Sequence, residues 1–127
     1  MTKIKLLIVD DELEFAATLA ERMELRGIET QIANTGQEAL EKVYFSPPDV
    51  VILDLKMPDM NGLEVLQGIK ALHPSIEVIM LTGHGSTASG IESKEKGAFD
   101  YIMKPVDLTE LLEKLKLAYE KRSKVEK

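Results

Sequence analysis

Short apolar segments alternate with longer amphipathic ones along the whole chain, and this alternation limits the possible folds more than any other feature. Apolar runs of strand length cover residues 4–10, 28–32, 50–54, 76–82 and 98–104. Helical spacing or composition marks residues 12–26, 34–43, 63–72, 83–97 and 107–122. Strands that alternate with helices in this way predict βαβ units with right-handed crossovers. The expected fold class is therefore α/β, with a five-stranded parallel sheet that is doubly wound by five helices.

The strands differ in their expected burial. Residues 4–10 and 50–54 are almost entirely apolar, which is typical of strands that are covered on both faces. Residues 28–32 alternate between apolar and polar side chains, which predicts a strand with one wetter face at an edge of the sheet. The apolar stripe of the first helix is expected to comprise Leu13, Ala16, Ala17, Leu19, Ala20 and Met23. That of the third helix is expected to comprise Leu63, Leu66, Ile69 and Leu72.

Local signals mark several helix ends. Gly27 follows the first helix where a C-terminal glycine is common. Thr35 and Glu38 have the spacing of a capping box, and Asp107 is a candidate N-cap for the last helix. Residues 86–97 are rich in Ser, Thr and Gly, so we expect a helix of poor intrinsic propensity whose packing is easily biased.

Composition excludes several classes of protein. The 127 residues suit one domain, and the absence of cysteine excludes disulfides, thiolate metal sites and a cysteine nucleophile. Lack of cysteine also fits a reducing cytoplasm. The net charge of −6 argues against nucleic-acid binding, which needs clustered Lys and Arg. Neither a membrane-spanning run nor a signal peptide is recognisable, so no membrane association is expected.

Polar side chains stand where four of the five strands end. The first strand ends at Asp10, Asp11 and Glu12, the third at Asp54, the fourth at Thr82 and the fifth at Lys104. In a parallel sheet these positions share one edge, and ligands of such sheets bind outside the carboxyl ends of the strands. Carboxylates gathered there would repel one another unless a cation joined them. Oxygen ligands without His or Cys point to a hard divalent ion, Mg²⁺.

The same residues suit phosphoryl transfer. Mg²⁺ takes one or two carboxylates together with phosphate oxygens, and a carboxylate can act as a nucleophile that forms an aspartyl phosphate. Asp54 has the character of the acceptor, while Lys104 and Thr82 could stabilise charge on the transferred oxygens. Each residue alone has an ordinary structural explanation as a turn, cap or strand residue. Their joint occurrence on four strand ends favours the functional interpretation.

Four motifs in this chain resemble those of a known family. The stretches LLIVDDE, VVILDLKMPDMNG, IMLTGHG and GAFDYIMKP are similar to the motifs of the response regulator receiver domain, the phosphoacceptor module of two-component signalling. The resemblance implies a CheY-like fold with strand order 2-1-3-4-5. It extends from the first strand to the last helix, so residues 1–122 are expected to form the domain. Residues 123–127 are expected to be a charged tail or the start of a linker.

The resemblance also implies a role for each metal-site residue. Asp54 matches the phosphorylated aspartate and is itself a metal ligand. Asp11 matches the direct Mg²⁺ ligand, and Asp10 is expected to act through water. Lys56, two residues past the acceptor, is expected to bind the ion through its backbone carbonyl.

A second group of residues matches the family's signalling positions. Thr82 matches a hydroxyl that moves toward the phosphoryl group, and Lys104 matches a lysine that pairs with the phosphoryl group or the acceptor carboxylate. Tyr101 matches an aromatic position that changes orientation, although a half-buried strand aromatic would look the same. These changes would alter the surface made by the fourth helix, fifth strand and fifth helix. The bond before Pro105 is expected to be cis, as it often is in this family.

The resemblance implies partners and leaves some questions open. A sensor histidine kinase or a phosphotransfer protein would supply the phosphoryl group, and an output domain or target protein would read the result. The sequence leaves open whether the receiver stands alone, whether it forms a homodimer on activation, and how Lys56 and His84 affect the phosphoryl lifetime. We expect the domain to catalyse its own phosphorylation and dephosphorylation but no turnover of small molecules.

Two other classes compete with this interpretation. A phosphatase of the haloacid dehalogenase type also uses an Asp nucleophile, Mg²⁺, Thr and Lys, but it needs a second acid where Lys56 stands. A flavin or nucleotide carrier of the same architecture would need a glycine-rich loop after the first strand, and acids stand there instead.

Overall fold

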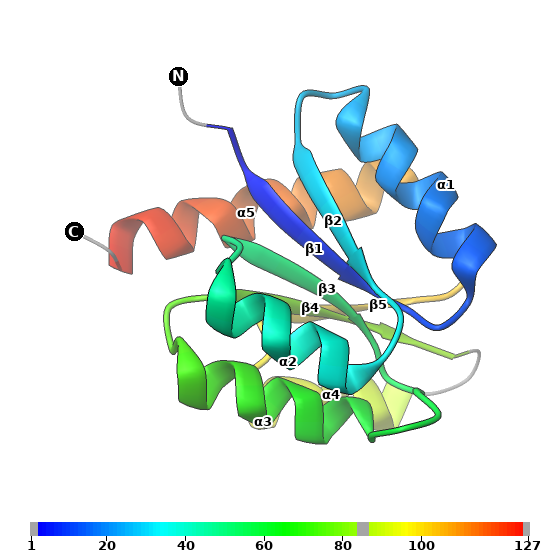
Figure 1. Cartoon of the computed structure of the whole chain (residues 1–127), viewed down its shortest axis with the longest axis vertical. Helices are drawn as coiled ribbons and strands as arrows, with labels where there is room; N and C mark the ends of the chain where they lie inside the picture. Colours follow the sequence, from blue (N-terminus) through cyan, green and yellow to red (C-terminus); the bar gives the residue numbers. More distant parts are fainter. Residues whose placement is uncertain (1–2, 84–86, 126–127) are drawn as a thin grey trace.

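A single five-stranded parallel sheet forms the centre of the molecule (Figure 1). The computed structural model describes residues 3–83 and 87–125. The strands are β1 (Lys5–Val9), β2 (Glu29–Ala33), β3 (Val50–Asp54), β4 (Glu77–Thr82) and β5 (Asp100–Met103). They lie in the order β2-β1-β3-β4-β5, and all four pairings are parallel. The predicted fold class and strand order are confirmed.

Five helices cover the two faces of this sheet. They are α1 (Leu13–Glu24), α2 (Gly36–Phe45), α3 (Gly62–Leu72), α4 (Thr87–Glu95) and α5 (Leu108–Val125). Helices α1 and α5 lie on one face, and α2, α3 and α4 lie on the other (Figure 1). No helix in the described parts of the chain is both long enough and apolar enough to cross a bilayer.

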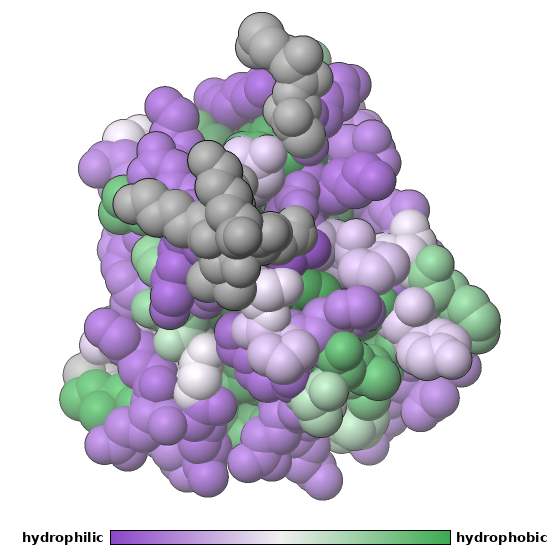
Figure 2. All heavy atoms as spheres, turned by 90° about the vertical axis from the view of Figure 1, so that its left-hand side faces the viewer, coloured by the Kyte–Doolittle hydropathy of each residue, from purple (hydrophilic) through white to green (hydrophobic). Residues whose placement is uncertain are grey.

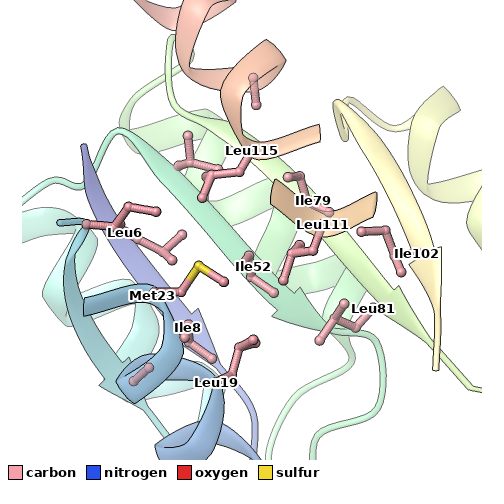
Figure 3. Close-up of a cluster of buried hydrophobic side chains, with 14 of the residues drawn as sticks. Leu6, Ile8, Leu19, Met23, Ile52, Ile79, Leu81, Ile102, Leu111 and Leu115 are labelled. Carbon is pink, nitrogen blue, oxygen red and sulfur yellow. The ribbon is translucent and has the colours of Figure 1, made fainter. Parts of the chain in front are cut away.

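Each face of the sheet has its own hydrophobic core. Figure 3 shows the core under α1 and α5, where Ile8, Ile52 and Leu81 from the sheet meet Met23 and Leu115 from the helices. Because successive strand side chains point to opposite faces, the alternate residues of the same strands fill the second core under α2 and α3. Strand β3 is buried along its whole length, whereas β2 alternates between exposed and covered residues at the edge, as predicted.

Helix ends follow most of the local signals. Gly27 adopts a positive φ of 80° just after α1, which a glycine tolerates at low cost. The Thr35 side chain accepts a hydrogen bond from the Glu38 N–H, but the Glu38 carboxylate accepts from the N–H of Asn34 rather than of Thr35, so only half of the predicted capping box forms. Asp107 caps α5 by accepting from the N–H groups of Thr109 and Glu110.

Some sequence expectations were wrong in detail. Leu13 and Leu72 were placed in buried stripes, but their exposed fractions are 64% and 40%; they are the first residue of α1 and the last residue of α3. Ala17 was placed in the same stripe as Leu13 and is also exposed. Helix α5 continues to Val125, past the predicted end at residue 122, since neither Gly nor Pro interrupts the segment. The Lys104–Pro105 peptide bond is cis, as expected.

Ion pairs hold the far end of α5 against the amino edge of the sheet. The Arg122 guanidinium lies 3.2 Å from the Asp49 carboxylate just before β3. Lys121 and Lys70 lie 3.8 and 3.7 Å from the buried carboxylate of Glu77 at the start of β4. The face that carries both chain ends is otherwise mostly hydrophilic, with apolar side chains in separate patches (Figure 2).

A close backbone approach makes Gly62 sensitive to substitution. A Cβ atom at this position would lie 2.6 Å from the Leu55 carbonyl oxygen and 2.8 Å from that of Asp54, and neither backbone atom can move freely. We expect Gly62→Ala to lower the free energy of unfolding by about 1–3 kcal/mol, measured by chemical denaturation.

The matched control is Gly68→Ala in the same helix. There the nearest atom is the flexible end of the Leu40 side chain at 2.8 Å, and alanine adds about 1 kcal/mol of helix propensity that offsets the crowding. Equal losses of stability in the two variants would contradict the proposed cause.

Candidate functional site

Three carboxylates converge at the carboxyl edge of the sheet. Asp10, Asp11 and Asp54 can each place one oxygen within 4.8 Å of the others. Asp10 is fully buried, Asp54 is 7% exposed, and Asp11 is exposed. This arrangement follows from the parallel register, in which Val9 pairs with Leu53, so that the next residues, Asp10 and Asp54, lie side by side.

Asp10 is held by several hydrogen bonds. Its carboxylate accepts from the Glu12 N–H at 2.9 Å, its N–H donates to the Ala33 carbonyl at 3.1 Å, and its carbonyl accepts from the Asn34 side-chain amide at 3.0 Å. The buried carboxylate therefore has a fixed position between β1, β2 and the start of α1.

Among the residues that the structure describes, only Lys104 brings an ammonium group to these carboxylates. Its Nζ lies 3.0 Å from Asp10 Oδ2, 3.0 Å from Glu12 Oε1 and 3.9 Å from Asp54 Oδ1. The Phe15 ring lies beneath it, with its centroid 4.6 Å away. Burial alone would lower the pKa of Lys104, but its hydrogen bonds to Glu12 and Asp10 and the charge of Asp54 outweigh burial and raise it.

The electrostatics of the pocket act most strongly on Asp54. Burial and the nearby Asp10 carboxylate raise the pKa of Asp54 from 3.8 to about 6. The Lys104 ammonium and the Lys56 N–H, which donates to Asp54 Oδ1 at 3.4 Å, oppose this rise without cancelling it. An ionised Asp54 is therefore a destabilised anion that gains from any additional cation.

The loop after Asp54 is fastened to the neighbouring helix. The Asp59 carboxylate accepts hydrogen bonds from the N–H groups of Gly36 and Gln37, at 2.9 and 3.0 Å, at the start of α2. These two bonds lower the pKa of Asp59. Asn61 forms a full capping box with Glu64 at the start of α3. The loop that carries Lys56 is thus anchored at both ends.

Thr82 and Tyr101, on β4 and β5, have no recorded side-chain contact with the carboxylates. Thr82 is fully buried, and its hydroxyl has no hydrogen-bond partner among the residues that the structure describes. Its strand neighbour Leu81 pairs with Asp54, which places Thr82 at the same edge of the sheet. The Tyr101 ring packs against α4 at Gly90, where an added Cβ would lie 2.3 Å from the ring.

Four of the five residues predicted to form the pocket therefore come together, namely Asp10, Asp11, Asp54 and Lys104. Thr82 reaches the same edge without a recorded side-chain contact to them. The backbone carbonyl of Lys56 as a metal ligand stays a prediction, and His84 lies outside the described residues.

Sequence reasoning missed most of the residues that support this pocket. Glu12 and Phe15 contact Lys104, Asn34 holds the Asp10 carbonyl, and Asp59 fastens the loop. Of these, only Glu12 was noted at the end of the first strand, where it directly follows the acidic pair, but it was given no role. The other three are ordinary helix and loop residues whose partners lie far away in the sequence.

The donor set fits a hard divalent cation. Three carboxylates close enough to share an ion, one of them buried with a raised pKa, form an oxygen-only site of the kind that Mg²⁺ prefers. Asp10, Asp11 and Asp54 are the residues that would hold it, and the ion would neutralise their mutual repulsion.

Comparison with known proteins agrees with this geometry. Residues 6–116 match the response regulator receiver domain, so the chain belongs to that family. It is 34% identical over 118 residues to the regulatory protein LuxO of Vibrio vulnificus strain YJ016, and 39% identical over 112 residues to the regulatory protein AtoC of Escherichia coli strain K12. The matches cover 93% and 87% of this chain but 26% and 24% of those proteins, so it spans about a quarter of their length.

A solved structure shares the whole fold. The CheY-like response regulator receiver domain protein from Methanospirillum hungatei JF-1 superimposes with a TM-score of 0.90 at 36% sequence identity. The match covers 97% of this chain and 98% of that one, which agrees with the strand order and the two helical layers described above.

The raised pKa of Asp54 predicts a pH-dependent effect of its removal. A raised pKa in the folded state means that the ionised carboxylate destabilises the fold, with no cost below about pH 4 and the full cost above about pH 6. In metal-free buffer with a chelator, we expect Asp54→Asn to increase the free energy of unfolding by about 1–2 kcal/mol at pH 7.5, allowing for solvent screening, and hardly at all at pH 4.

Asp59→Ala is the control with the opposite sign. The lowered pKa of Asp59 means that its carboxylate stabilises the fold above its usual pKa and loses that effect as the pH falls. This variant should be destabilised at pH 7.5 and less so in acid. A stability gain for Asp54→Asn that does not change with pH would show that buried charge is not the cause.

Proposed function

We propose that this receiver domain accepts a phosphoryl group on Asp54 from a sensor histidine kinase or a phosphotransfer protein, with Mg²⁺ as cofactor. The observation that supports this most directly is the convergence of the Asp54 carboxylate with two further acids and one ammonium group at the carboxyl edge of the sheet. We assign the domain to residues 1–122. The role places it in the cytoplasm, as the absence of cysteine also favours.

Each residue of the pocket has its own role in the proposed phosphoryl transfer. An oxygen of ionised Asp54 forms a bond to phosphorus while the bond from phosphorus to the donor histidine nitrogen breaks, and that nitrogen keeps the electron pair. Asp11 and Asp54 would hold a Mg²⁺ ion directly and Asp10 would hold it through water, and the ion would supply positive charge to the phosphoryl oxygens. The Lys104 Nζ already lies 3.9 Å from Asp54 Oδ1 and can pair with the negative charge of the transferred phosphoryl group. The buried hydroxyl of Thr82 can donate a hydrogen bond to a phosphoryl oxygen.

The alternative of a phosphatase of the haloacid dehalogenase type has less support. Such an enzyme needs an acid two residues after the nucleophile, and this position holds an exposed lysine, Lys56. A lysine cannot deliver and recover a proton as a carboxylic acid does near neutral pH. We therefore assign the domain to signalling, with catalysis limited to its own phosphorylation and dephosphorylation.

The surface made by α4, β5 and α5 is the proposed output, for a downstream domain or target and for a homodimer on activation. Asp100 on β5 pairs with Lys114 of α5 at 2.7 Å and lies 3.9 Å from Lys94 of α4. Helix α4 consists largely of weak helix formers, so its own backbone contributes little to its stability and packing on the sheet must hold it. The Tyr101 ring packed on Gly90 is one such contact and links β5 to α4.

Phosphorylation can be tested with a small donor. We expect acetyl phosphate with Mg²⁺ to add the mass of one phosphoryl group to the wild-type protein, and none to Asp54→Asn, by intact mass spectrometry. Omission of Mg²⁺ should prevent the addition because the acidic pocket would repel the donor. Glu14→Gln, which alters an exposed acid outside the acidic cluster, is the matched control and should still be modified. An unmodified wild-type protein, or modification of Asp54→Asn at the same level, would contradict the proposal.

The link between Tyr101 and α4 gives a second test. Alanine at position 90 would place its Cβ 2.3 Å from the Tyr101 ring, so we expect Gly90→Ala to displace the ring, with loss of NMR cross-peaks between the ring and α4. Phosphorylation should persist, because neither residue lies among the carboxylates. Glu92→Ala, at an exposed site of α4, controls for helix propensity and should leave the ring in place. Unchanged cross-peaks of the Tyr101 ring in Gly90→Ala would contradict the packing described here.

A further inference from the structure

The Lys104 ammonium group contacts both the carboxylates of the pocket and the start of helix α1. Two carboxylate oxygens lie 3.0 Å from its Nζ, one from Asp10 and one from Glu12, whereas the acceptor Asp54 is 3.9 Å away. Glu12 is thus one of the two nearest partners, although the sequence motifs give it no part in the pocket. Its side chain is 65% exposed, while that of Lys104 is only 21% exposed.

The backbone of Glu12 is fixed, but its side chain is not used for helix capping. Its N–H donates to Asp10 Oδ1 at 2.9 Å, and its carbonyl accepts from the Ala16 N–H at 3.0 Å. Glu12 is the N-cap residue of α1, yet its carboxylate accepts no hydrogen bond from the N–H groups of the first turn. That carboxylate instead reaches Lys104 of the loop after β5, 92 positions along the chain.

Glu12 is also separate from the acidic cluster. The three carboxylates that can share an ion are those of Asp10, Asp11 and Asp54, and Glu12 is not among them. Phe15, one turn further along α1, provides the ring beneath the ammonium, so α1 contacts Lys104 with both a charge and an aromatic face. The charge on Glu12 can therefore be removed without changing a metal ligand.

We propose that Glu12 is a positioning residue that holds the Lys104 ammonium on the α1 side of the pocket and so opposes its movement toward a phosphoryl group on Asp54. The proposal rests on the function proposed above for Asp54 and Lys104. A phosphoryl group adds negative charge next to Asp54, and Lys104 must turn from Glu12 to pair with it. Since the Glu12 carboxylate is exposed to solvent, the effect is a modest adjustment of the balance between the two arrangements and not a block.

The first test needs neither metal nor phosphate. In chelator-treated protein, the NMR signals of the Lys104 Cε and Nζ atoms should shift in Glu12→Gln, which keeps the shape of the side chain but removes its charge. Glu14→Gln is the matched control, because Glu14 is an exposed acid in the first turn of α1 without a recorded contact to Lys104. Glu14→Gln should leave the Lys104 signals in place. Unchanged Lys104 signals in Glu12→Gln would overturn the proposal.

The second test measures how strongly Glu12 opposes the pairing of Lys104 with a phosphoryl group on Asp54. Beryllofluoride with saturating Mg²⁺ serves as the probe for a phosphoryl group on the acceptor, and its apparent Kd is determined by NMR titration. We expect Glu12→Gln to bind about two- to fivefold more tightly than wild type, and Glu14→Gln to match wild type. Equal or weaker binding by Glu12→Gln would overturn the proposal.

The two proposals fail in different ways. If the wild-type protein neither binds beryllofluoride nor reacts with acetyl phosphate, the proposed function fails and the proposal for Glu12 fails with it. If the wild-type protein binds the probe and Glu12→Gln shows no gain, the function stands and only the role of Glu12 is rejected.

Discussion

The repulsion between two buried carboxylates is the constraint on which this site depends. Parallel pairing of β1 with β3 places Asp10 and Asp54 side by side where the strands end, and both are largely removed from water. Like charges at such a distance in a low-dielectric setting are costly unless a cation compensates them. The compensating charge comes from Lys104 after β5, two strands away from β3 in the sheet. Strand order, burial and the identity of these three residues are therefore parts of one electrostatic arrangement.

The molecule combines a rigid part with a compliant one. Strands β1, β3 and β4 are packed on both faces, and the far end of α5 is tied to the sheet by the pairs of Arg122 with Asp49 and Lys121 with Glu77. Helix α4 contrasts with this frame, because it has little amphipathic character and approaches β5 through a glycine against Tyr101. The proposed output surface lies on this α4 side, where the Tyr101 ring and Gly90 are in contact.

Much of this was predictable from sequence because it depends on periodic patterns. The strand positions, the edge location of β2 and the convergence of Asp10, Asp11, Asp54 and Lys104 follow from apolar runs and the geometry of parallel sheets. The contacts of Glu12 with Lys104 and of Asp59 with α2 did not follow, because side-chain partners separated by many residues leave no periodic signal. Leu13 was assigned to the core for a related reason: spacing gives the apolar face of a helix but not how much of that face the rest of the protein covers.

The pocket takes its supports from several neighbouring elements, and this has a consequence for signalling. Asn34 before α2 holds the Asp10 carbonyl, Asp59 holds the start of α2, and the N–H of Lys104 donates to the Thr82 carbonyl at 2.9 Å. A lysine shared among three carboxylates cannot strengthen one pairing without weakening another. In the proposed function, added charge at Asp54 would act first on Lys104, and the backbone bond from Lys104 to Thr82 joins the ends of β5 and β4. Asp54 and the end of β5 are far apart along the chain, but the ammonium group of Lys104 couples them directly by charge.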